Sequence, residues 1–332
     1  MSSVPCAWVN SFVFAQFLHN ICPPPAPKTN RLVPDRDEVK EITMRQVSRG
    51  MGAITLLVLC TGVFAGFGGR LHPFGDSLSL LRIPLGVICV IGLVFRMPMV
   101  LRVCVGCAAA LALMTTVPML ATTRGDGTLL LYSKNLLYRN DALPALAADI
   151  IASDADVVTL QEVGQRNDVF LAMMADHYPY QHLCRFSGWS GIAVLSKTPF
   201  VADARCSIHR GVAVAQIEKD GQAVWVASVH LPWPYPYDHA RSAGAATALL
   251  GQLAGAIVVA GDFNIFPWAS TTHQIRQVSG TRIAGPLRPT YDLYGLPLFL
   301  DHVYSPGGGH VTYRDRLGSD HLGVLAQLSL DH

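Results

Sequence analysis

Three long apolar runs follow one another in the first 124 residues of the chain, and arginines flank them. They cover residues 51–69, 77–95 and 103–123, and Arg82 is the only charged residue inside them. Each run is close to the ~20 residues that a helix needs to cross the hydrocarbon core of a bilayer. Three buried helices of a soluble core are the alternative, but the short connectors and a charged content of 14% disfavour it. The sequence therefore predicts a three-helix transmembrane anchor over residues 44–124.

The basic residues set the predicted orientation of this anchor. Arg96 and Arg102 lie between the second and third runs without an acid, whereas the loop between the first two runs carries Arg70 and Asp76. Six basic residues precede the first run: Lys28, Arg31, Arg36, Lys40, Arg45 and Arg49. Because positively charged segments stay in the cytoplasm, we expect everything after Arg124 to lie outside it, which in a bacterium is the periplasm. The chain would then be a multi-pass protein of the cell inner membrane.

Residues 1–43 differ in composition from the rest of the chain, with a CPPPAP segment and the mixed-charge stretch PDRDEVKE. Met44 begins a basic stretch that leads directly into the first apolar run. We expect residues 1–43 to be a disordered tail, or the product of a start codon assigned too far upstream.

Residues 125–332 have the pattern of a globular α/β domain. Apolar strand-like runs alternate with helical stretches, and the two alternating runs around Asp220-Gly221 predict a hairpin. The segment has 14 Lys and Arg against 18 Asp and Glu, a net charge of −4, and no run of basic residues interleaved with aromatics. Nucleic-acid binding draws much of its affinity from such residues, so the domain lacks that signature. Cys184 and Cys206 are its only cysteines and lie on neighbouring candidate strands, so we expect either a disulfide or two buried thiols.

Polar side chains end several of the apolar strands in this domain. An acid at the end of a buried strand needs a partner, because an unpaired buried carboxylate is costly. Acids, amides and histidines at strand ends are what a composite metal and phosphate site requires. Each could instead be a turn former or a hydrogen-bonded core residue. The candidates are Asn135, Glu162, His230, Asp262, Asn264, Asp301, Asp320 and His321.

The ordered segments NL, QEV, GIAVLSK, VHL, GDFN, LDHV and GSDH resemble the endonuclease/exonuclease/phosphatase (deoxyribonuclease-I-like) superfamily. With the apolar front, the chain resembles membrane-anchored bacterial members with three N-terminal transmembrane helices. The resemblance implies an α/β (α+β) four-layer sandwich, with two packed mixed β-sheets flanked by helices, over residues 125–332.

The resemblance also implies a divalent metal site. Glu162 matches the glutamate that coordinates the cation, Asn135 the asparagine beside it, and Asp320 a residue that reaches a second metal position. Mg²⁺ is the expected ion, with Mn²⁺ as an alternative, because it prefers hard oxygen ligands and keeps several waters. No other cofactor and no protein partner are implied.

The remaining candidates match catalytic residues of the same superfamily. Asp262 matches the aspartate that aligns or deprotonates the attacking water, and Asn264 the amide that holds a phosphate oxygen. His321 matches the histidine of the SDH motif, and Asp301 the carboxylate that orients it. His230 resembles an additional histidine near the phosphate or leaving group. Whether Asp262 or His321 is the base stays open.

We therefore expect a membrane-tethered, Mg²⁺-dependent hydrolase of phosphoester bonds, of the phosphodiesterase or nuclease type. A cation and hydrogen-bond donors would offset the charge that develops on the phosphate oxygens. The alternatives are a phosphatase or phosphodiesterase acting on phospholipid headgroups or small molecules, and a tethered binding module without catalysis. The substrate is accordingly a nucleic acid or a lipid headgroup.

Overall fold

The computed structural model describes residues 36–121 and 127–331. The chain divides into two units, Met1–Met51 and Gly52–His332. Helix α1, Arg36–Ala65, begins inside the segment that was expected to be a tail, and it crosses the boundary between the units. Residues 1–35 of that expected tail lie outside the described part.

The apolar front of the chain forms helices, but they do not make three simple spans. Two helical stretches, Val39–Ala65 and Met99–Ala121, are long and apolar enough to cross a membrane. The second contains α4 (Met99–Met114) and α5 (Val117–Ala121).

The expected middle span, residues 77–95, is interrupted instead. The short helix α2 (Pro73–Ser79) and α3 (Arg82–Gly92) meet at a bend of 62° after the 3-10 turn Gly68–Arg70. Pro84 explains the break, because its ring is incompatible with a helical hydrogen bond to the carbonyl of Leu80. The guanidinium of Arg82 also donates to the carbonyls of Gly66 (2.8 Å) and Trp268 (3.0 Å), which fixes the start of α3.

The strands of the C-terminal domain form one twelve-stranded sheet, in the order β3-β4-β2-β1-β14-β13-β9-β12-β8-β7-β6-β5. The expected two separate sheets, and with them the four-layer description, are therefore corrected. The junction is β9, which pairs antiparallel with β12 through Ile283 and Tyr304 and parallel with β13 through Ala284 and Gly309. The strands are β1 Leu129–Asn135, β2 Val157–Gln161, β3 Tyr180–Arg185, β4 Gly191–Ser196, β5 Ala202–Cys206, β6 Val212–Lys219, β7 Gln222–His230, β8 Ala256–Asp262, β9 Arg282–Gly285, β12 Asp301–Ser305, β13 Gly308–Arg314 and β14 Gly323–Ser329.

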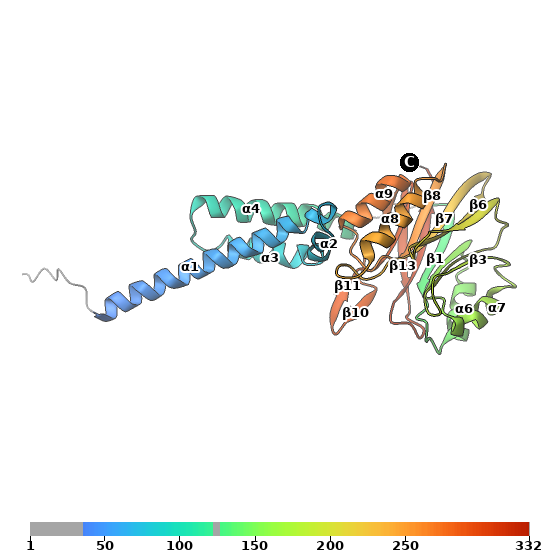
Figure 1. Ribbon diagram of the computed structural model, residues 1–332, viewed down its shortest axis with the longest axis horizontal. Helices are drawn as coiled ribbons and strands as arrows, with labels where there is room; N and C mark the ends of the chain where they lie inside the picture. Colours follow the sequence, from blue (N-terminus) through green and yellow to red (C-terminus); the bar gives the residue numbers. More distant parts are fainter. Residues whose placement is uncertain (1–35, 122–126, 332) are drawn as a thin grey trace, which may run out of the picture. The chain divides into compact units, whose positions relative to one another are not determined.

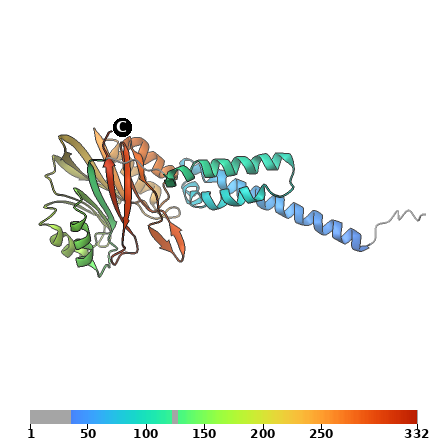
Figure 2. The same cartoon turned by 180° about the vertical axis from the view of Figure 1, so that it is seen from behind.

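The sheet folds back on itself, so that its two halves pack face to face through an apolar layer. Leu131 of β1 and Val157 of β2 belong to the same buried cluster as Val226 of β7 and Val258 of β8. Helices cover the outer faces: α6 (Leu143–Ala152) and α7 (Asp168–Met174) lie on one half, and α8 (His239–Leu250) and α9 (Ser270–Ser279) on the other (Figure 1). Seen from behind, the red C-terminal strands lie beside the green strand β1 (Figure 2).

Local sequence signals account for much of this architecture. The predicted hairpin is confirmed: β6 and β7 pair in register, and Asp220 and Gly221 between them both have positive φ, 53° and 80°. A second, two-stranded hairpin consists of β10 (Tyr291–Leu293) and β11 (Leu296–Leu298). This hairpin was not anticipated from the sequence, nor were β5, β9, β13 and α9.

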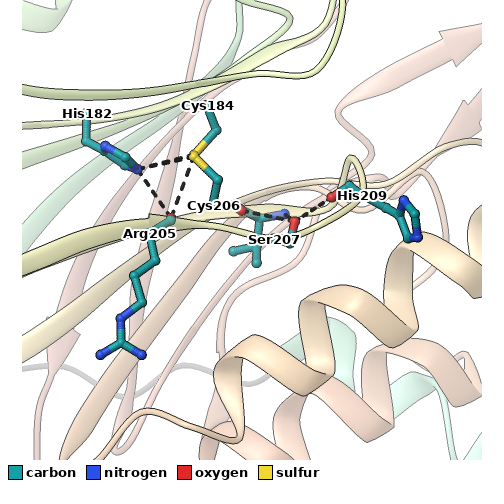
Figure 3. The surroundings of a disulfide bond; sticks show 7 residues. His182, Cys184, Arg205, Cys206, Ser207 and His209 are labelled. Carbon is teal, nitrogen blue, oxygen red and sulfur yellow. Dashed lines mark hydrogen bonds between the residues drawn. A yellow bond between two sulfur atoms is a disulfide. The ribbon is translucent and has the colours of Figure 1, made fainter.

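Cys184 and Cys206 form a disulfide, which was one of the two expected outcomes. The bond joins β3 to the end of β5, the first and last strands in the sheet order (Figure 3). It therefore ties together the two edges that meet when the sheet folds. Nε2 of His182 lies 3.2 Å from Sγ of Cys184, but with the two sulfur atoms bonded to each other this group is a covalent link and not a metal site.

Candidate active site

The candidate residues are gathered at one end of the folded sheet by the alternation of side chains along each strand. Asn135 ends β1, His230 ends β7 and Asp262 ends β8, while Asp301 begins the antiparallel strand β12. Asp262 is directly opposite both His230 and Asp301 in the register of the sheet. Neighbouring strand ends thus place side chains that are up to 166 residues apart in sequence beside one another.

Two carboxylates share one amide at the centre of the site. Nδ2 of Asn135 donates to Oδ2 of Asp262 (3.0 Å) and lies 3.3 Å from Oε1 of Glu162. Burial raises the pKa of the Glu162 carboxyl, and it raises that of Asp262 to about 7, although nearby positive charge and donated hydrogen bonds act against it. The site therefore concentrates negative charge that its own hydrogen bonds only partly offset.

Backbone conformation turns two of these side chains into the site. Glu162 (φ 54°) and Asn264 (φ 51°) both occupy the left-handed region, which non-glycine residues rarely adopt. Oε2 of Glu162 accepts a hydrogen bond from the Tyr138 amide (3.2 Å). Nδ2 of Asn264 donates to Oδ2 of Asp262 (3.1 Å) and to the Leu231 carbonyl (2.9 Å), so in this state Asn264 holds Asp262 in place.

His321 and Asp301 form a hydrogen-bonded pair beside Asp262. Nδ1 of His321 lies 2.7 Å from Oδ2 of Asp301, and its Nε2 lies 3.8 Å from Oδ2 of Asp262. Burial acts to lower the pKa of His321, but the charges of Asp301 and Asp262 and the hydrogen bond to Asp301 raise it to about 10. An imidazolium at this position is suited to donate a hydrogen bond or a proton to a phosphate oxygen.

His230 lies between the two central carboxylates, and its ring differs from that of His321 in charge. Its Nε2 is 3.9 Å from Oε1 of Glu162 and 3.8 Å from Oδ2 of Asp262. Burial, followed by the charges of Arg210 and His321, lowers the pKa of His230 well below its usual value. Its Nδ1 has no hydrogen-bond partner among the described residues. His230 is therefore a neutral imidazole whose Nδ1 is available for a further hydrogen bond.

A divalent cation fits the oxygen donors of Glu162 and Asp262. Both carboxyls have raised pKa values, which a cation between them would lower, and carboxylate oxygens are the ligands that Mg²⁺ prefers. Asp262, Asp301 and His321 also lie close enough together to hold an ion. We favour Glu162, because the raised pKa of His321 keeps its imidazole protonated, and a protonated ring nitrogen does not bind a cation. Asp320 is exposed next to His321, and its charge acts on Glu162.

Three further side chains at this site were not found from the sequence. Arg210 follows β5, and its charge acts on Asp262 and Glu162. The centroid of the Tyr291 ring lies 4.8 Å from the centroid of the His321 ring. The ammonium of Lys134, which is completely buried, donates to the carbonyls of Arg316 and His321 (2.7 Å each) and thereby holds the loop that carries His321. A charged residue at an inner strand position was the one available signal for Lys134.

Acids, an amide and an imidazole hydrogen-bonded to a carboxylate thus converge at one end of a mixed α/β domain. The chain belongs to the Endonuclease/Exonuclease/phosphatase family, whose pattern matches residues 127–321. Members of this family are generally hydrolases that act on phosphoester bonds.

Solved structures of similar fold cover about 60% of this chain. A TDP2 from D. rerio, complexed with a single-strand DNA product, is 18% identical over 60% of this chain and 98% of its own, with a TM-score of 0.50. A family protein from Leptotrichia buccalis is 16% identical over 60% of this chain and 99% of its own, with a TM-score of 0.49. A Staphylococcus aureus beta toxin with bound magnesium ions is 17% identical over 60% and 99%, with a TM-score of 0.48. No curated protein matches the chain. At 18% identity the D. rerio structure, with its TM-score of 0.50, supports the fold alone, and no argument rests on the other two.

Proposed function

We propose that this chain is a divalent-metal-dependent phosphoester hydrolase of the phosphodiesterase or nuclease type, tethered to a membrane by its N-terminal helices. The observation that supports it most is the single site in which Asn135 contacts both carboxylates while the Asp301–His321 pair faces Asp262. Family membership supports the reaction class.

Glu162 and Asn135 would hold the cation, with the carboxylate of Asp262 beside it, and Asp320 would serve a second ion. A Mg²⁺ or Mn²⁺ ion bound there supplies Lewis-acid stabilisation of the negative charge on the phosphate. Asn135 now directs its Nδ2 at both carboxylates and its Oδ1 at the Leu137 amide (3.0 Å), so the side-chain amide would have to turn before Oδ1 could bind the cation. Burial raises the pKa of Glu162, and a bound cation would stabilise its ionised form.

Asp262 would orient the attacking water and accept its proton. Its pKa of about 7 suits a group that exchanges protons near neutral pH, and Asn264 fixes its carboxylate. His321, held as an imidazolium by Asp301, would donate a proton to the leaving oxygen, and neutral His230 would donate a hydrogen bond to the phosphate. With its pKa of about 10, His321 is mostly protonated, so we assign the role of base to Asp262.

The membrane tether is part of the same proposal. The two apolar helical stretches support membrane association. If the bent pair α2–α3 serves as a third, broken span, the basic residues before and between the apolar runs favour a C-terminal domain outside the cytoplasm, at the periplasmic face of an inner membrane.

Hydrolysis of a chromogenic phosphodiester by the purified full-length protein tests the proposal. Turnover should require Mg²⁺ or Mn²⁺, and chelation should abolish it. Asp262→Asn should lower kcat by about 10²–10⁴-fold, the range for a general base. Asp203→Asn, at an exposed acid of β5, is the matched control and should retain full activity. If no phosphoester is hydrolysed with either metal, the chain is a binding module with the same fold.

A further inference from the structure

One apolar cluster joins the ends of the N-terminal helices to the wall of the candidate active site. Its buried centre consists of Phe266, Trp268, Leu298 and Leu300, and we call it the junction cluster. Leu80 and Ile83, at the break between α2 and α3, pack against it, as do Met119 and Leu120 of α5. Trp233 and Tyr291 pack against it from the domain, and Tyr291 also contacts His321. The catalytic imidazole is thus one side chain away from the cluster that receives the helix ends.

Polar contacts fix the domain to the segment between the first two apolar runs. The buried carboxylate of Asp76 accepts hydrogen bonds from the amides of Ser270 (2.7 Å) and Thr271 (3.0 Å) and from the Thr271 hydroxyl (2.6 Å). It therefore caps the N-terminus of α9, where a negative charge is favourable. Nε1 of Trp268 donates to the Ser79 carbonyl (2.8 Å). With these contacts the site stays at a set distance from the ends of the apolar helices.

Exposed aromatic and apolar side chains surround this junction. The Tyr235 ring packs edge-on against His72 (5.4 Å between centroids) and Phe74 (6.1 Å), at the N-terminus of α2. The tip of the β10–β11 hairpin carries Tyr294, which is fully exposed, and Leu296, which is 57% exposed. Tyrosine and tryptophan are enriched where membrane proteins meet the headgroup layer. Continuity with the apolar helices indicates that a bilayer surface covers these side chains.

The charge of the domain argues against a polynucleotide as the occupant of this rim. Residues 125–332 carry a net charge of −4, whereas affinity for nucleic acid grows with each Lys or Arg that neutralises a phosphate. A single headgroup phosphate requires far less positive charge. Arg210, whose charge acts on Asp262 and Glu162, lies where it can provide that charge.

We infer that the substrate is a phosphodiester in the headgroup of a lipid in the same membrane that holds the apolar helices. The inference rests on the function proposed above and names its substrate class. Water adds its oxygen to phosphorus, one P–O ester bond breaks, and the released oxygen takes up a proton. The products are a phosphomonoester and an alcohol, one of which stays in the bilayer.

Full-length protein reconstituted into vesicles of phosphatidylethanolamine and phosphatidylglycerol tests the inference. Hydrolysis, followed by ³¹P NMR and mass spectrometry, should be faster for lipid in the protein's own vesicle than for lipid in added protein-free vesicles, by about 10²-fold from effective concentration. A soluble chromogenic phosphodiester, assayed in the same vesicles, reports the proposed chemistry independently. Single-stranded DNA and RNA are the competing substrates.

A variant at the tip of the β10–β11 hairpin tests whether these side chains contact the bilayer. Tyr294→Ser combined with Leu296→Ser should lower the ratio of lipid to soluble-diester turnover about tenfold, because two side chains lose apolar burial. Val169→Ser on α7, a position 50% exposed, is the matched control and should leave the ratio unchanged. Turnover of the soluble diester and of DNA or RNA without turnover of lipid would overturn the inference and leave the proposed function intact. An unchanged ratio in the hairpin variant would also overturn it, and no turnover of any substrate would overturn both.

Discussion

The interior of the folded sheet has an apolar middle and a polar end, and the same strands build both. Along β7 the inward side chains are Val224, Val226, Ser228 and His230, and along β8 they are Val258, Ala260 and Asp262. On β1 the inward series is Leu129, Leu131, Ser133 and Asn135. Each strand therefore changes from branched apolar residues, through a small residue, to a functional group at its end. The difference teaches that the middle supplies stability, whereas the polar end gives up stability to keep charges buried.

The polar end should respond most strongly to the loss of a carboxylate. Glu162→Gln keeps the size of the side chain and removes the charge that would hold the cation. We expect a loss of turnover of about 10²-fold or more at low Mg²⁺, in the range of a lost transition-state electrostatic contact, with partial recovery at high Mg²⁺. Steady-state kinetics over a Mg²⁺ series measures this, and full metal-dependent activity of the variant would refute the assignment.

Glu162→Gln also tests whether the polar end lowers the free energy of unfolding. The carboxyls of Glu162 and Asp262 have raised pKa values in the fold, so the stability linked to them is present at low pH and is lost as the pH rises through their folded-state pKa values, which for Asp262 is about 7. Mg²⁺ should therefore raise Tm more at pH 8 than at pH 5, with a gain of about 2.7 kcal/mol at 100 times Kd. Calorimetry at one fixed Mg²⁺ concentration should show a smaller gain for Glu162→Gln than for the wild type, because the variant binds the ion more weakly.

The imidazole side of the polar end should show a smaller effect with a characteristic pH dependence. Asp301→Asn removes a charge that raises the pKa of His321 to about 10. Activity that needs the imidazolium is lost as the pH rises, so the alkaline limb of the profile should move to lower pH in the variant. The loss at neutral pH should be about tenfold to 10²-fold, equivalent to a hydrogen bond to a charged group. An additive double variant with His321→Ala would show that the two residues do not act as one unit.

The disulfide at the sheet edges should affect stability and leave the chemistry least changed. Replacing both Cys184 and Cys206 by serine opens a link with a sequence separation of 22, which should cost about 3 kcal/mol. Urea unfolding of the protein in detergent measures the loss. An equal loss upon reduction of the wild-type protein would attribute it to the bond and not to the serine side chains.

The sequence by itself determined most of the long strands and helices of the domain, the hairpin at Asp220-Gly221, and the polar residues at the strand ends, but it did not reveal β5, β9, β13, α9 or the β10–β11 hairpin. The features that it determined depend on the periodicity of apolar side chains and on the turn-forming residues, and both can be seen in a short stretch of sequence. The apolar runs could also be recognised from the sequence, because their length and composition are sufficient evidence.

Only the tertiary structure decided which of these elements touch. That β9 joins the two halves into one sheet depends on pairing with strands distant in sequence. The position of Arg82 at the start of α3 depends on the carbonyls of Gly66 and Trp268. Arg210, Tyr291 and Lys134 enter the site through charge, ring contact and buried hydrogen bonds that no local pattern encodes. The physical reason is common to all of them: burial and long-range contacts set the energy of a charged group, and both exist only once the chain has folded.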